Sequence, residues 1–84
     1  SEGLKAYKVL KVIGKGSFGK ALLVQGNGDK KMYVIKEINI SELTPKEQRE
    51  AKNEVEILRK LKDPNIVGYH ESFLEKGNLY IAMD

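Results

Sequence analysis

The sequence predicts an α+β fold, in which a five-stranded, mostly antiparallel sheet carries one main helix between its third and fourth strands. Short segments rich in β-branched and aromatic residues occur on both sides of one longer segment with helical periodicity. Clusters of glycine and asparagine separate the short segments, which favours hairpin connections and antiparallel pairing. The 84 residues suffice for one small domain or for part of a larger one. We expect residues 1–6 to form a lead-in and residues 7–84 to form the fold.

Three strands are expected before the helix, over residues 7–13, 20–25 and 31–38. A glycine-rich turn ends the first strand. Gly26–Asp29 joins the second strand to the third, because glycine and asparagine tolerate the backbone angles of tight turns. Alternation should place the third strand's side chains on two faces, with Tyr33, Ile35 and Glu37 on one and Val34, Lys36 and Ile38 on the other.

The helix should begin after Thr44 and run to about Lys62. Thr44 can cap the helix, Pro45 suits its first position, and Glu47 completes a capping box. The helix should stop before Pro64, since proline cannot continue the hydrogen-bond ladder and disfavours a helical residue before it. The strands expected after the helix are residues 66–73 and 79–83, joined by a turn over residues 75–78.

Composition argues against several classes of function. The 15 basic and 12 acidic residues give a net charge of +3 and are interspersed, so we expect no nucleic-acid-binding face. No apolar run approaches the roughly 18 residues that span a bilayer, so we expect no membrane partner. The chain has no cysteine, which excludes disulfides and cysteine-based metal sites. We expect no metal ligands among these residues.

Gly14, Gly16 and Gly19 form a G-x-G-x-x-G motif after the first strand. Glycines at this spacing let the backbone approach a bulky partner, and the amide groups of such a turn can hold phosphate oxygens. The alternative is a flexible hairpin tip without a ligand. A dinucleotide-binding turn is disfavoured, because its glycines must lead into a helix, whereas residues 20–25 have the pattern of a strand.

Two charged residues, Lys36 and Glu54, stand where apolar residues are expected. Lys36 shares its strand face with Val34 and Ile38, and Glu54 falls on the apolar side of the predicted helix. A buried, unpaired carboxylate costs several kcal/mol, so we expect the two to form an ion pair that turns Lys36 toward phosphates under the glycines. The alternatives are an edge-strand lysine and a glutamate that reaches water past the helix rim.

These features together resemble the N-terminal, ATP-binding lobe of eukaryotic protein kinases. Within that group, the amino-acid sequence is similar to the NIMA-related (Nek) Ser/Thr kinases. The resemblance spans residues 7–84. It is carried by the glycine motif with its flanks, by the strand that holds Lys36, and by the helix segment around Glu54. It also includes the Pro-Asn-Ile-Val of residues 64–67 and the Leu-Tyr-Ile-Ala-Met-Asp of residues 79–84.

The resemblance implies a role for each matching residue. Lys36 would contact the α- and β-phosphates of ATP and would be held by an ion pair with Glu54. Leu58 and Tyr69 match members of a hydrophobic stack whose alignment accompanies the active state. The residues implied at the ATP site, or at the site of an ATP-competitive inhibitor, are Ile13, Gly14, Gly16, Ser17, Phe18, Gly19, Ala21, Val34, Lys36, Met83 and Asp84.

Three residues depart from the usual kinase pattern. Ala21 stands where many kinases have valine, which makes the roof of the implied adenine pocket roomier. Val34 replaces the more usual alanine before the lysine and narrows that pocket. Asp63 takes the place of a common histidine.

The H-R-D and D-F-G motifs of the kinase large lobe do not occur in these residues. The resemblance therefore implies a lobe cut at the hinge, inactive alone, whose Mg²⁺ and protein substrate are bound with a large lobe. Joined to that lobe, it would transfer the γ-phosphate of ATP to protein Ser/Thr. The resemblance also implies an intracellular, cytoplasmic address, with the centrosome or cytoskeleton as candidate sites. The alternative function is a non-catalytic module that self-associates or docks a partner, because an isolated lobe bares apolar surface.

Overall fold

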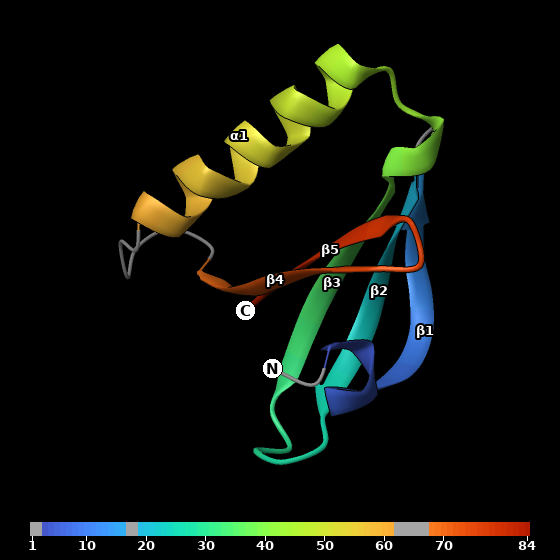
Figure 1. The fold of residues 1–84 in the computed structure, drawn as a ribbon. Helices are drawn as coiled ribbons and strands as arrows, with labels where there is room; N and C mark the ends of the chain where they lie inside the picture. Colours follow the sequence, from blue (N-terminus) through green and yellow to red (C-terminus); the bar gives the residue numbers. More distant parts are fainter. Residues whose placement is uncertain (1–2, 17–18, 62–67) are drawn as a thin grey trace.

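The chain forms one sheet with one long helix beside it (Figure 1). The computed structural model describes residues 3–16, 19–61 and 68–84. Its helical elements are η1 (Gly3–Ala6), η2 (Ile40–Glu42) and α1 (Pro45–Leu61). Its strands are β1 (Tyr7–Lys15), β2 (Gly19–Gly26), β3 (Met32–Asn39), β4 (Tyr69–Glu75) and β5 (Asn78–Met83). Within the described ranges, no helix combines the length and the apolar character needed to cross a membrane.

The strands lie in the order β1-β2-β3-β5-β4, and every neighbouring pair is antiparallel. The predicted fold class is therefore confirmed, with α1 between the third and fourth strands. β3 is the central strand because β2 and β5 flank it, so the explanation of Lys36 as an edge-strand lysine is wrong. β4 continues to Glu75, beyond the predicted end of the fourth strand. Ile66 and Val67, predicted to start that strand, lie outside the described residues.

Side chains on the two faces of the sheet form two buried clusters. As predicted, Tyr33 and Ile35 share one face of β3, whereas Ile38 packs with the cluster on the other face. The first cluster contains Tyr7, Leu22, Val24, Tyr33, Ile35, Tyr80 and Ala82. The second joins the helix to β5 and contains Ala51, Val55, Leu79 and Ile81. Only part of the second face is covered, because α1 lies toward β3, β5 and β4 and away from β1 (Figure 1).

The tyrosines of the first cluster each bury a ring and give the hydroxyl a carboxylate partner. Tyr7 donates a hydrogen bond to Glu71, Tyr33 donates to Asp29 over 2.5 Å, and Tyr80 donates to Glu37 over 3.0 Å. Burial, the largest cause, and then Glu71 raise the pKa of Tyr7. A carboxylate acceptor gives the hydroxyl proton of a buried phenol a hydrogen-bond partner. These pairs were not predicted, because each joins residues whose contact depends on strand register or on the turn.

The Tyr33–Asp29 pair predicts a loss of stability at alkaline pH. The hydrogen bond to Asp29 raises the pKa of Tyr33 from 10.0 to about 12. Above pH 10 the unfolded chain therefore releases this proton while the folded chain still holds it, so the free energy of unfolding falls until about pH 12. Below pH 10.0 the contribution is fully present. Urea unfolding should show the advantage of the wild type over Tyr33→Phe shrinking across this window. An advantage that stays constant with pH would contradict the prediction.

The predicted capping box is present at the start of α1. The Thr44 amide donates to Glu47 Oε1 over 2.9 Å, and the Glu47 amide donates to Thr44 Oγ1 over 3.2 Å. Two amides that would otherwise lack intrahelical partners are thus satisfied. Gln48 adds a connection that was not predicted, because its side chain donates to the carbonyls of Ile40 and Leu43. The start of α1 is therefore held by its own capping box and by a hydrogen bond from Gln48 to η2.

Thr44→Ala should lower the free energy of unfolding by about 1 kcal/mol, the usual effect of removing a helix cap. The change leaves the Glu47 amide without its acceptor, and Thr44 is exposed, so no core packing is altered. Chemical denaturation gives the measurement, and Thr44→Ser, which keeps a capping oxygen, should lose only a few tenths of that amount. Equal losses in both variants would show that the cap is not the cause.

Candidate functional site

A cleft of about 360 Å³ lies on the part of the sheet that α1 leaves open. Its size is within the range of small-molecule sites. Four strands, β1, β2, β3 and β5, contribute its walls, so residues far apart in the sequence meet there. The lining residues are Gly14, Lys15, Gly16, Gly19, Lys20, Ala21, Val34, Lys36, Glu37, Ile38 and Met83.

Strand pairing explains why most of the predicted ATP-site residues gather at this cleft. Ala21 of β2 lies opposite Lys36 of β3, and Val34 of β3 lies opposite Met83 of β5. Residues that lie opposite each other in an antiparallel pair share a face. The three glycines and these four residues all line the cleft.

The other predicted residues are placed differently. Ile13 is half exposed, at 48%, and is not among the residues that line the cleft. It has no cross-strand partner, because the β1–β2 register shifts between Val12 and Gly14 and leaves it in a bulge. Asp84 is exposed, and its amide donates to the Gly68 carbonyl over 3.0 Å. Ser17 and Phe18 lie outside the described residues. Roles for these four residues remain predictions.

The three glycines of the motif differ in what their surroundings require. A Cβ on Gly19 would lie 1.7 Å from the Glu37 carbonyl oxygen, so the packing of β2 against β3 demands glycine there. Within the described parts of the chain, a Cβ on Gly14 or on Gly16 would meet no atom closer than 3.9 Å. None of the three has a positive φ. Neither backbone angle nor packing within the described residues therefore explains Gly14 and Gly16, whose missing side chains leave room at the cleft.

Lys36 stands between the first cleft and a second cleft of about 480 Å³ that separates β3 from α1. Its side chain is exposed, so the amino group keeps its hydration. The helix contributes Glu47, Glu50 and Glu54 to the second cleft. An ion pair within 4.0 Å joins Lys20 to Glu37, and none joins Lys36 to Glu54, both of which are described residues. The predicted Lys36–Glu54 ion pair is therefore not formed in this structure, although both side chains line the same cleft.

The orientation of α1 explains this correction. The helix buries Ala51 and Val55, which are 9% and 7% exposed. At 100° per residue, the direction midway between these two lies about 80° from Glu54, and Glu54 is exposed. Ile57, which was predicted to share the apolar face, is 51% exposed. The predicted stripe omitted Val55 and was centred too far around the helix. Tyr69 packs against this side of the sheet, and neither the Leu58 side chain nor Asp63 is among the described parts.

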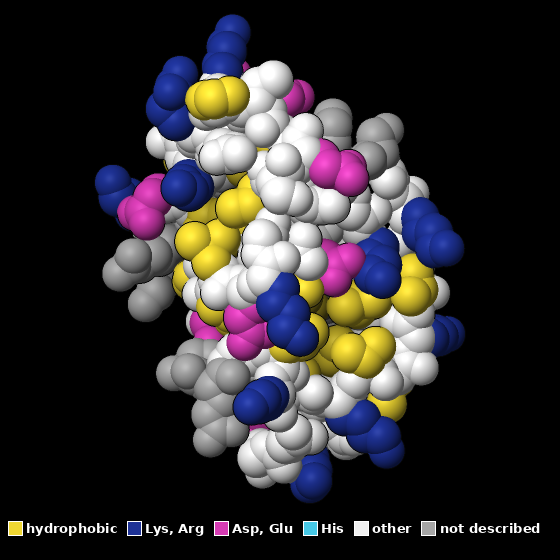
Figure 2. Space-filling view, turned by 45° about the vertical axis from the view of Figure 1, so that its right-hand side comes forward, with side chains coloured by type: hydrophobic (Ala, Val, Ile, Leu, Met, Phe, Trp, Pro, Cys, Tyr) yellow, Lys and Arg dark blue, Asp and Glu magenta, His cyan; other side chains and the backbone are white. Residues whose placement is uncertain are grey.

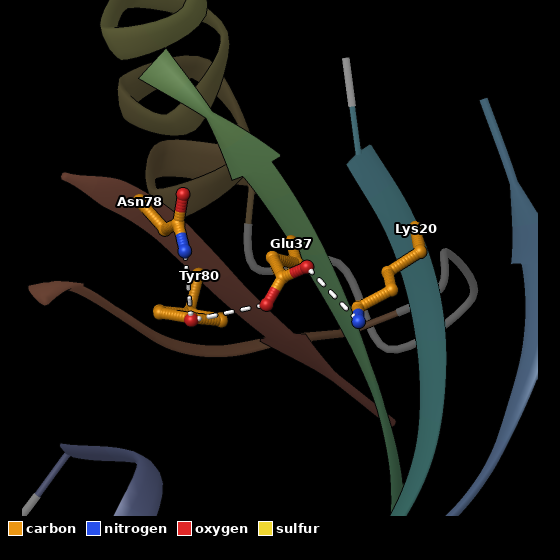
Figure 3. Close-up of polar contacts among 4 residues, drawn as sticks. All are labelled: Lys20, Glu37, Asn78 and Tyr80. Carbon is orange, nitrogen blue, oxygen red and sulfur yellow. Dashed lines mark hydrogen bonds and ion pairs between the residues drawn. The ribbon is translucent and has the colours of Figure 1, made fainter. Parts of the chain in front are cut away.

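Sequence reasoning missed a polar row at the base of the glycine loop (Figure 3). Lys20 Nζ lies 3.7 Å from Glu37 Oε2, and the Tyr80 hydroxyl donates to Glu37 Oε1 over 3.0 Å. Asn78 Nδ2 donates in turn to the Tyr80 hydroxyl over 3.1 Å. Burial, the largest cause, raises the pKa of Tyr80. One sequence signal was present, because counting back from the Gly26–Asp29 turn sets Lys20 opposite Glu37.

Comparison with known proteins gives an independent result. The protein kinase domain matches residues 7–84. The chain is 54% identical over 81 residues to "Serine/threonine-protein kinase Nek1" of Mus musculus, covering 96% of this chain and 7% of that protein. It is 50% identical over 78 residues to "Probable serine/threonine-protein kinase nek3" of Dictyostelium discoideum, covering 93% and 7%. For "Serine/threonine-protein kinase Nek5" of Homo sapiens the values are 49% over 78 residues, covering 93% and 11%.

The chain therefore spans only a small part of the length of these relatives, between 7% and 11%. The matched range nevertheless includes the strands β1 to β5 and the helix α1. A family match over residues 7–84, in a chain with this strand order and helix position, shows that the chain belongs to the protein kinase domain family and has the fold of its N-terminal lobe.

Proposed function

We propose that this chain binds ATP in the cleft beneath the glycine motif and acts as the nucleotide-binding part of a protein Ser/Thr kinase. The observation that carries the proposal is the room left at Gly14 and Gly16, where no described atom of the chain would contact an added Cβ closer than 3.9 Å. Glycine is most useful at such positions when a ligand must approach the backbone closely. Phosphate oxygens that bind loop amides make that kind of approach.

The remaining walls of the cleft suit the other parts of ATP. Ala21, Val34 and Met83 offer an apolar surface for the adenine ring. Lys36 brings a cation to the same cleft, where it can contact phosphate oxygens. A Lys36 that is held near the phosphates would orient them and offset their negative charge, which are the main requirements of phosphoryl transfer.

Glu54 is proposed to set the position of Lys36 rather than to touch ATP. Lys36 and Glu54 already line one cleft without an ion pair between them. A rotation or approach of α1 that brought Glu54 to Lys36 would fix the cation at the boundary between the two clefts. Mg²⁺, when bound through ligands supplied by a large lobe, would neutralise phosphate charge. The large lobe would also orient the acceptor hydroxyl of the protein substrate.

The test is phosphate transfer by this chain joined to the large lobe of a Nek-type kinase. With ATP and a Ser/Thr-containing protein substrate, the joined domain should phosphorylate the protein, and the large lobe alone should not. Adenosine should inhibit the reaction in competition with ATP, because both need the same apolar walls. A folded, joined domain that neither binds ATP nor transfers phosphate would overturn the proposal.

A second candidate function rests on exposed apolar residues. Figure 2, which brings the β1 side of Figure 1 forward, shows hydrophobic side chains at the surface between Lys and Arg side chains. Large apolar residues that are between 43% and 48% exposed on β1 are Val9, Leu10, Val12 and Ile13. Soluble monomers rarely leave large contiguous apolar patches exposed, so we propose that the isolated chain self-associates through these β1 residues. Sedimentation should show an average molecular mass that rises with protein concentration, and Leu10→Lys should reduce this rise. A monomer at all concentrations would contradict this proposal.

A further inference from the structure

A row of side chains crosses three strands immediately after the glycine motif. Lys20 of β2 lies opposite Glu37 of β3, which lies opposite Tyr80 of β5. Alternation along β3 turns Glu37 to the face opposite Lys36. Lys20 and Glu37 are among the residues that line the cleft, but the Glu37 carboxylate is turned to the other face, where it accepts a hydrogen bond from Tyr80 of the first cluster. Glu37 can therefore support the motif without its carboxylate contacting a bound nucleotide.

Glu37 is held on both of its carboxylate oxygens. Tyr80 donates to Oε1 and Lys20 lies against Oε2 (Figure 3). The Glu37 side chain is only 19% exposed, so its charge is poorly hydrated and depends on these partners. Tyr80 is 5% exposed and its ring stacks on Phe73 at 5.4 Å. One end of the row is thus fixed in the core, and the other end is the residue that follows the last glycine.

Glu37 also contacts the glycine motif through its backbone. Its carbonyl oxygen occupies the place that a Gly19 side chain would need. The Gly16 amide donates to the Gly19 carbonyl over 2.8 Å, which joins the two arms of the motif. The position of Gly16 at the cleft therefore depends on where Gly19 and Lys20 are held against β3.

We propose that Glu37 is a positioning residue for the phosphate groups of the bound nucleotide. By tying Lys20 and the adjoining Gly19 to Tyr80, it sets how closely the glycine motif approaches those phosphates. The inference rests on the proposed ATP site. It predicts that loss of the Glu37 charge weakens the binding of ligands with phosphates and leaves the binding of ligands without them unchanged. A general loss of structure would weaken both.

The experiment compares ADP and adenosine binding by calorimetry, using the chain joined to a Nek-type large lobe. Glu37→Gln should weaken ADP binding by roughly threefold to fivefold, the scale of a partly exposed ion pair, and should leave the Kd of adenosine unchanged. Tyr80→Phe removes only the hydroxyl that orients Glu37. It should give the same selective loss, and it carries the test if Glu37→Gln does not fold.

Asp29→Asn is the matched control. Asp29 also accepts a hydrogen bond from a tyrosine, Tyr33, but it lies at the other end of the β2–β3 hairpin. This variant should leave the ratio of ADP to adenosine affinity unchanged. Equal losses for the two ligands in Glu37→Gln, unchanged ADP binding, or tighter ADP binding through a released Lys20 would each overturn the positioning role. A wild-type domain that bound neither ligand would instead refute the ATP site itself.

Discussion

Lys36→Met in the joined kinase domain should lower kcat/KM by roughly 100- to 1,000-fold, the scale of removing one preorganised electrostatic contact to a transition state. Lys36 lies on the central strand and lines the proposed ATP cleft. Methionine keeps an unbranched side chain of similar reach but removes the charge. Because the Lys36 side chain is exposed and is in no ion pair among the described residues, the free energy of unfolding should change little. The measurement is steady-state phosphorylation, with unfolding followed in parallel.

Lys11→Met is the control for this prediction. Lys11 is an exposed lysine of β1 and does not line the cleft, so its loss should leave kcat/KM close to the wild-type value. Transfer by Lys36→Met at a rate comparable with wild type would show that the lysine has no role in the reaction. A large loss of stability in Lys36→Met would show that its activity cannot be interpreted as lost chemistry.

Gly19→Ala should destabilise the chain by roughly 3 kcal/mol, the upper part of the usual range for overpacking. The new Cβ would lie 1.7 Å from the Glu37 carbonyl oxygen and 2.8 Å from its carbon. These are backbone atoms of the neighbouring strand, so no rotamer change can relieve the clash. The ends of β2 and β3 would have to separate, which also breaks the Lys20–Glu37 contact. Urea denaturation gives the change in free energy of unfolding.

Gly16→Ala is the matched comparison, since the described atom that its Cβ would approach is the Gly19 carbonyl oxygen, at 3.9 Å. Its free energy of unfolding should be unchanged, or higher by up to about 1 kcal/mol through the less flexible unfolded chain. ATP affinity should nevertheless fall, because the methyl group occupies space at the cleft. Equal stabilities of the two variants would contradict the difference assigned to the two glycines.

The fold could be predicted well because its signals are local. Alternating β-branched residues, glycine turns and the Thr44–Glu47 capping box each depend on neighbours within a few positions, and the structure confirms them. The lining of the cleft by the glycines, Ala21 and Val34 also followed from the kinase resemblance. What failed was the phase of α1: the buried face depends on which residues meet β5, and Val55 rather than Glu54 does so.

Sequence by itself therefore determined the five strands and the helix α1, their order, and the glycines and lysine that now share one cleft. Only the tertiary structure decided that Lys36 is central rather than at an edge, and that Glu54 lines its cleft without pairing with it. It also distinguished two glycines of the motif: Gly19 is required by the packing of β2 against β3, whereas Gly16 has room for a side chain among the described residues. The physical reason is that turns and caps depend on adjacent residues. Strand order, helix rotation and close backbone approach depend on contacts between segments that are distant in the chain.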